Sequence, residues 1–81
     1  MAMQKKRPPE FWKIGPWGRE MLEYLEQENP KLVRQMTADG SLWEYLNREN
    51  DRLDEMMLTL MQTQGLPENQ AKEIVRAEYQ T

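Results

Sequence analysis

Three neighbouring carboxylates are the side chains in this sequence whose spacing could bind a metal ion. Asp51, Asp54 and Glu55 fall within five positions of each other, in a stretch with a helical pattern of apolar residues. Divalent cations require several oxygens that converge from different elements, and one face of one helix does not provide them. We therefore expect these carboxylates to be solvated, and we expect no metal ion and no cofactor.

The nucleophile that a hydrolase or transferase would need is also poorly supported. Ser41 is the single serine, and the chain contains no histidine and no cysteine. A catalytic serine needs an adjacent base, most often histidine, and zinc sites and disulfides need histidine or cysteine. The composition predicts a protein that is not an enzyme, and the absence of cysteine fits a reducing cytoplasm.

Basic residues gather near the N-terminus. Residues 1–19 contain five basic residues and one acidic residue, whereas residues 20–81 contain six basic and thirteen acidic residues. Lys5, Lys6, Arg7 and Lys13 could contact the phosphates of a nucleic acid. The alternative is a solubilising tail, and the acidic remainder of the chain disfavours a broad DNA-binding face.

Aromatic and methionine side chains offer a different chemistry, the binding of another protein. Aromatic residues anchor many protein interfaces, and methionine adapts to irregular partners. Trp43, Tyr45, Glu49 and Met56 lie close together along the longest predicted helix, and we interpret them as the first candidate contact surface. Trp12, beside the basic segment, is the second.

Four helices must position these side chains. Apolar residues recur with helical spacing, and Pro16, Pro30, Gly40, Gly65 and Pro67 supply start and stop signals. Helices are predicted over about residues 16–28, 30–38, 42–64 and 67–79. Ser41 and Glu44 have the spacing of a capping box at the start of the third helix. No run of residues alternates as a strand would.

The third predicted helix has an apolar stripe about 160° wide, which needs more than one packing partner. A homodimer through this helix is therefore an alternative to coverage by the chain itself. Glu49 and Asn50 interrupt the stripe. They line a shallow gap, form hydrogen bonds across an interface, or lie in a loosely packed and half-exposed region.

These observations predict an all-α fold, a small assembly of three to four helices around one long central helix. Residues 1–10 are predicted to be a disordered basic arm, because Pro8 and Pro9 oppose helix formation there. Residues 11–81 are predicted to form a single helical domain, with Phe11–Pro16 extended and packed against it. No apolar run approaches the roughly 20 residues that span a bilayer, so no membrane association is expected.

The order of several short segments resembles one known family. The segments are Ile14–Arg19, Tyr24–Glu26, Gly40–Leu42, Tyr45–Leu46, Glu55–Met56, Gln64–Glu68 and Ala71–Val75. Together they are similar to the TnpV group, small proteins encoded by conjugative transposons and phage-like elements of bacteria. Longer members have a segment with tryptophan and paired asparagines before the last helix, and it is missing here.

The resemblance implies a mobile-element accessory protein in the bacterial cytoplasm, and it supplies no catalytic residues. We expect a protein partner encoded by the host or by the element. One form of such binding is inhibition of a host defence protein or of a protein that handles nucleic acid. The alternative function is a nucleic-acid-binding accessory protein that uses the basic arm.

Overall fold

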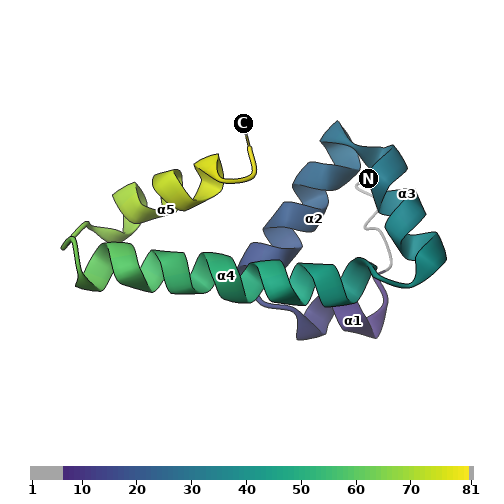
Figure 1. The fold of residues 1–81 in the computed structure, drawn as a ribbon, viewed down its shortest axis with the longest axis horizontal. Coiled ribbons are helices and arrows are strands. Elements are labelled where there is room, and N and C mark those ends of the chain that lie inside the picture. The colour runs from purple at the N-terminus through teal and green to yellow at the C-terminus, as the bar shows by residue number, and fades with distance from the viewer. Residues whose placement is uncertain (1–6, 81) are drawn as a thin grey trace, which may run out of the picture.

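The computed structural model describes residues 7–80, which form five helices and no strand (Figure 1). The helices are α1 (Pro9–Lys13), α2 (Pro16–Glu28), α3 (Pro30–Asp39), α4 (Leu42–Gln62) and α5 (Glu68–Ala77). The predicted all-α fold around one long helix is confirmed. No helix in this part of the chain combines the length and the apolarity that crossing a membrane requires.

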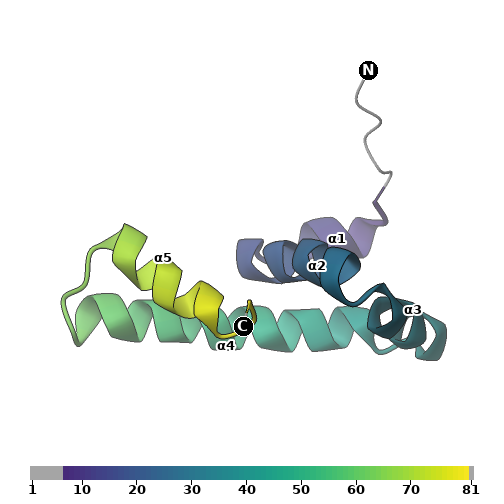
Figure 2. The same ribbon diagram turned by 90° about the horizontal axis from the view of Figure 1, so that it is seen from above.

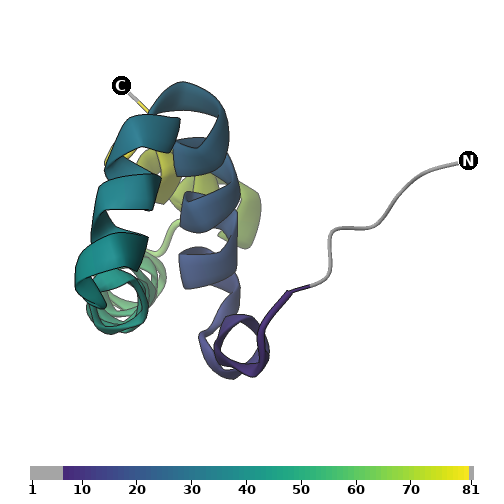
Figure 3. The ribbon, with the colours of Figure 1, turned by 90° about the vertical axis from the view of Figure 1, so that its right-hand side faces the viewer.

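α4 is the axis on which the other helices pack. Figure 2 shows α1, α2 and α5 on the same side of α4, with α3 beside its N-terminal end. Figure 3 shows α2 and α3 lying side by side. The apolar stripe of α4 is therefore covered by different helices along its length, and the buried residues of α4 are Leu42, Leu46, Leu53, Met57 and Leu60.

The N-terminal segment differs from the prediction, because a short helix begins at Pro9. Proline suits the first helical position, where its missing N–H would have had no partner. Phe11 and Ile14 are buried in the core, so this segment packs against the domain as expected, but as a helical turn. Residues 7–10 are therefore part of the described fold, whereas Lys5 and Lys6 lie outside the described residues.

The connection between α2 and α3 follows the local signals. The Leu32 N–H donates to Asn29 Oδ1 at 3.3 Å, so Asn29 caps α3, and Pro30 is its first residue. α3 ends at Gly40, whose φ of 81° lies in the left-handed region. The Ser41 N–H then donates to the Met36 carbonyl at 3.0 Å, which closes the turn into α4.

The predicted capping box of Ser41 and Glu44 is wrong. The Ser41 hydroxyl donates to Asp39 Oδ1 at 2.5 Å, and the Ser41 N–H donates to the same oxygen at 2.9 Å. Ser41 has helical backbone angles (φ −95°, ψ −5°), whereas a capping side chain needs an extended backbone to face the N–H groups ahead of it. The bonds from Ser41, its hydroxyl first, lower the pKa of the Asp39 carboxyl.

Several side chains face differently from the prediction. The helical spacing of the apolar residues predicts that Met61 of α4 and Ile74 and Val75 of α5 face inward, yet Met61 and Ile74 are 38% and 45% exposed. Leu22, which this spacing does not single out, is 1% exposed. α4 ends at Gln62, two residues early, and the Leu66 N–H closes the turn on the Leu60 carbonyl at 3.2 Å. α5 sits on α4 through Ala71 and Val75, which are completely buried.

Asn50 forms a hydrogen bond between two helices. Of the alternatives for the polar residues in the apolar stripe, a hydrogen bond across an interface is therefore the one observed for Asn50. The Gly18 N–H, in the first turn of α2, donates to Asn50 Oδ1 on α4 at 3.0 Å. Glu49 lies on the same turn of α4, and its carboxylate accepts from Arg52 Nη2 at 2.8 Å. The polar interruption of the stripe is thus hydrogen-bonded, within one chain.

Candidate binding surfaces

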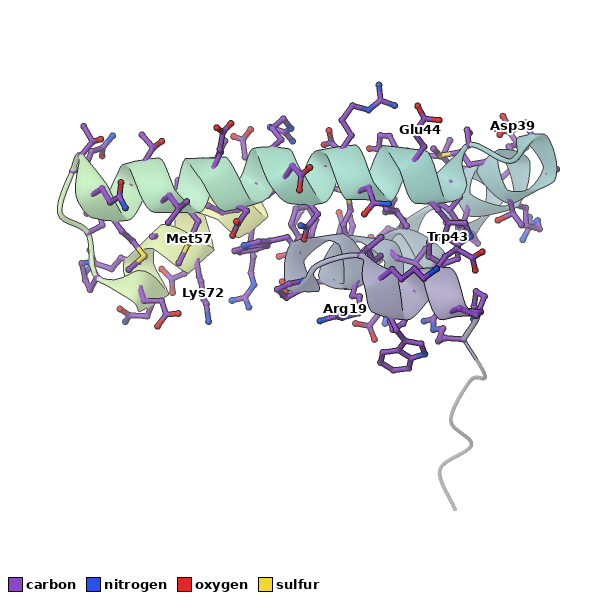
Figure 4. The ribbon with its side chains drawn as sticks, turned by 90° about the horizontal axis from the view of Figure 1, so that it is seen from below. Arg19, Asp39, Trp43, Glu44, Met57 and Lys72 are labelled. Atoms are coloured by element: carbon purple, nitrogen blue, oxygen red, sulfur yellow. The ribbon has the colours of Figure 1, made fainter. Side chains whose placement is uncertain are left out.

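The residues of the first predicted contact surface lie on two different edges of α4. Trp43 and Tyr45 are two positions apart on α4, which places them about 160° apart around the helix axis. Figure 4 shows Trp43 where α4 passes α1. Tyr45, Glu49 and Met56 share the opposite edge of the stripe. Proximity in sequence suggested one group, and helical geometry divides it.

The edge of α4 with Tyr45 and Met56 is largely occupied by the chain itself. Both side chains are half-buried against the core, and burial, with the nearby Glu49 carboxylate, raises the pKa of the Tyr45 hydroxyl. Glu49 pairs with Arg52, and Arg52 Nη1 also lies 3.4 Å from Oε1 of Glu78, the residue that follows α5. These groups already have partners within the fold.

Trp12 is the most exposed large apolar side chain in the described part of the chain, at 66% exposure. Its ring meets the ring of Phe11 edge-on, with centroids 4.8 Å apart and an interplanar angle of 89°. Phe11 is buried, and the Arg7 guanidinium lies over the Phe11 ring, 4.6 Å from its centroid. The exposed indole of Trp12 therefore lies on a short helix that the buried ring of its neighbour, Phe11, holds in place.

The predicted basic arm is only partly described, and one of its members has a structural role. Both terminal nitrogens of Arg7 donate to the Glu26 carboxylate of α2 at 2.8 Å, and this pairing raises the pKa of Arg7. Arg7 is therefore engaged in holding the N-terminal segment on α2. Lys13 is exposed at the end of α1. Lys5 and Lys6 lie outside the described residues.

A cavity of about 300 Å³ lies between α2, α4 and α5. Its lining residues are Pro16, Trp17, Glu20, Asp54, Met57, Glu68, Lys72 and Arg76. Figure 4 shows Met57 and Lys72 in this part of the molecule, on the opposite side of α2 from Trp43. A second hollow of about 230 Å³ lies at the α2–α3 turn, beside Pro30 and Arg34.

One wall of the larger cavity is a network that joins α5 to α2. Arg76 Nε donates to Glu20 Oε1 at 2.5 Å, and the Tyr79 hydroxyl donates to the same oxygen at 2.7 Å. The bond from Arg76, followed by the one from Tyr79, lowers the pKa of Glu20. Burial and the bond to Glu20 raise the pKa of Tyr79. Arg76 also lies 6.0 Å from the ring centroid of Trp17.

Sequence reasoning missed this cavity for a simple reason. Glu20 and Arg76 are 56 positions apart, and nothing local in either segment indicates that they meet. Asp54 was predicted to be a solvated carboxylate, and it is exposed, but it stands at the cavity. In the part of the chain that the structure describes, no group of three or more acidic side chains is arranged to hold a metal ion.

Comparison with known proteins places the chain in a family. The family model described as transposon-encoded protein TnpV matches residues 2–80, which is nearly all of the 81 residues. The match confirms the resemblance seen in the short sequence segments. Searches of curated proteins and of solved structures found no match.

Proposed function

This chain belongs to the family of the transposon-encoded protein TnpV, and from that premise we propose that it is a non-enzymatic accessory protein that acts by binding another protein. The binding would take place in the cytoplasm of a bacterial host. The target would be a host protein or a protein of the mobile element itself. Inhibition of a host defence protein or of a nucleic-acid-handling protein is one form of this function.

The observation that carries the proposal is the exposed indole of Trp12. Large aromatic side chains supply much of the binding free energy at protein interfaces. Trp12 is 66% exposed, while its neighbours Phe11 and Ile14 are buried, so the backbone beneath the indole is held in place. A preorganised anchor loses less conformational entropy on binding than a mobile one.

The test is affinity capture from a bacterial lysate with the full-length tagged chain, with and without nuclease. Trp12→Ala is compared with Leu58→Ala, because Leu58 is also a well-exposed apolar residue (48%) but lies on α4. We expect a stoichiometric protein that resists nuclease, is retained by Leu58→Ala and is lost with Trp12→Ala. Retention by both variants would show that α1 is not the contact surface.

The nucleic-acid alternative has its own variant in the same experiment. Deleting residues 1–13 would remove Arg7 and Phe11, which the fold uses, so a loss of binding would be ambiguous. Deleting residues 1–6 and changing Lys13→Ala removes the other candidate phosphate contacts, Lys5, Lys6 and Lys13, and leaves the contacts of Arg7 and Phe11 in place. Recovery of nucleic acid that this variant abolishes, with a steep dependence on salt, would replace protein binding by the alternative.

A further inference from the structure

We propose that the cavity between α2, α4 and α5 is a binding site for a cationic side chain, preferably the guanidinium of an arginine on a partner protein. Asp54 would provide the main anionic contact, and Glu68 the second. Trp17 and Met57 would form the apolar floor beneath the bound side chain. This site is separate from Trp12 and uses different helices.

The balance of charge in the cavity points to a cation. Five charged residues line it, and four of them are paired: Glu20 with Arg76, and Glu68 with Lys72. Among the residues that the structure describes, none forms a hydrogen bond or an ion pair with the Asp54 carboxylate. The cavity therefore retains one negative charge that the chain itself does not neutralise.

The Glu68 carboxylate can leave its ion pair with Lys72 at a small cost in free energy. Lys72 Nζ and Glu68 Oε1 are 3.6 Å apart, and both side chains are well exposed. Pairs of this kind, four positions apart on a helix, contribute only about 0.3–0.5 kcal/mol. An incoming guanidinium has five N–H donors in a planar fork, so its geometry allows it to bond to two carboxylates at once, whereas an ammonium group acts as a single point charge.

The floor of the cavity suits the same ligand. Trp17 and Met57 are almost completely buried, and they present an indole and a thioether to the cavity. Arg76 already lies near the Trp17 ring, so the chain itself uses this ring to pack a guanidinium. The volume of about 300 Å³ is at the lower end for ligand sites, which fits one long side chain better than a large cofactor.

The inference rests on the proposed function in one respect, because it assigns the cation to a protein. The chemistry of the cavity is tested first without any partner. The full-length chain is titrated with N-acetyl-arginine amide and followed by ¹H–¹⁵N NMR, with N-acetyl-citrulline amide as the uncharged isostere and N-acetyl-lysine amide as the ammonium comparison. The reporters are the Trp17 indole N–H and the backbone amides of Asp54 and Glu68.

We expect saturable shifts at these reporters with the arginine probe, weaker ones with lysine and none with citrulline. Asp54→Asn should weaken arginine binding about tenfold, the equivalent of one charge-assisted hydrogen bond. Asp51→Asn is the matched control, because Asp51 is exposed on the same helix but does not line the cavity. Equal shifts with citrulline, or equal losses in both variants, would overturn the proposal.

The source of the cation is tested with the captured partner. If the cavity receives an arginine of that protein, Asp54→Asn weakens capture and Asp51→Asn does not. If Asp54→Asn weakens binding of the arginine probe but leaves capture of the partner unchanged, the assignment of the cation to a protein side chain is overturned. Loss of capture in Trp12→Ala with unchanged arginine titration shows that the two sites are distinct, so either proposal can fail without the other.

Discussion

The side-chain amide of Asn50 caps a helix to which it does not belong. The first turn of α2 has N–H groups without partners in the helix, Gly15 has no side chain to cap them, and Pro16 has no N–H. Asn50 on α4 accepts from the Gly18 N–H. A Cβ on Gly15 would lie 2.4 Å from Asn50 Nδ2, and one on Gly18 would lie 3.1 Å from the Leu46 carbonyl oxygen. The two glycines thus allow α2 to approach α4 closely enough for this bond.

Removing this amide should destabilise the fold measurably. Asn50→Ala leaves the Gly18 N–H, which is buried, without an acceptor, and we expect the free energy of unfolding to fall by about 1–3 kcal/mol. Asn50→Asp keeps an acceptor at the N-terminus of α2 and should lose less. Urea unfolding followed by circular dichroism measures both, with the exposed Asn47→Ala as the control. Equal stabilities of Asn50→Ala and Asn47→Ala would show that the bond contributes nothing.

At the scale of the elements, local signals predicted where most helices begin and end. The apolar stripe of α4 is buried as its spacing predicts, whereas Leu22 and Ile74 depart from the pattern. Asn29 and Gly40 act through bonds to residues close in sequence, so their roles were visible in the sequence. The helix at Pro9 depends on distant contacts of Phe11 and Ile14, and no local signal predicted it. The cavity formed by Glu20, Asp54 and Arg76 requires three helices in place, and it was beyond sequence reasoning.

The orientation of α5 gives a direct test of the packing. The apolar pattern predicted that Ile74 and Val75 both face inward, whereas the structure buries Val75 completely and leaves Ile74 45% exposed. We expect Val75→Ala to lower the free energy of unfolding by about 2 kcal/mol, from lost apolar burial and the space left behind. Ile74→Ala should change it by less than about 0.5 kcal/mol. Denaturant unfolding of the two variants measures both free energies of unfolding. A larger loss of stability in Ile74→Ala than in Val75→Ala would mean that α5 is rotated about its axis.

The contact of α5 with α2 should depend on pH through Glu20. Bonds from Arg76 and Tyr79 lower its pKa below the ordinary 4.5, so its stabilising contribution is complete above pH 4.5 and is lost as the pH falls through the lower folded-state pKa. The stability difference between the wild-type chain and Glu20→Gln should therefore be positive at neutral pH and shrink below pH 4.5. Thermal unfolding across this range measures it. A difference that stays constant into strong acid would show that Glu20 is not paired in the folded state.

At the scale of the whole molecule, one long helix is covered in two parts. α1, α2 and α3 pack along the N-terminal half of α4, and α5 packs along the C-terminal half (Figure 1). The buried core runs from Phe11 through Leu46 and Leu53 to Val75. From the sequence pattern alone, the width of the apolar stripe on α4 favours a homodimer. Its central residues are covered within a single chain, which removes that ground for a second copy.

Self-association through α4 would therefore have to use the exposed residues Leu58 and Met61 rather than the stripe. Two such side chains, with Ile74 on the neighbouring helix, offer less apolar area than stable dimers bury. We expect a monomer by light scattering and a thermal midpoint that does not change over about a hundredfold range of protein concentration. A midpoint that rises with concentration would contradict this, and Leu58→Lys would locate the contact: if it makes the midpoint independent of concentration, the dimer forms through this face of α4. An unchanged concentration dependence in that variant would place the contact elsewhere, with Trp12 as the next residue to change.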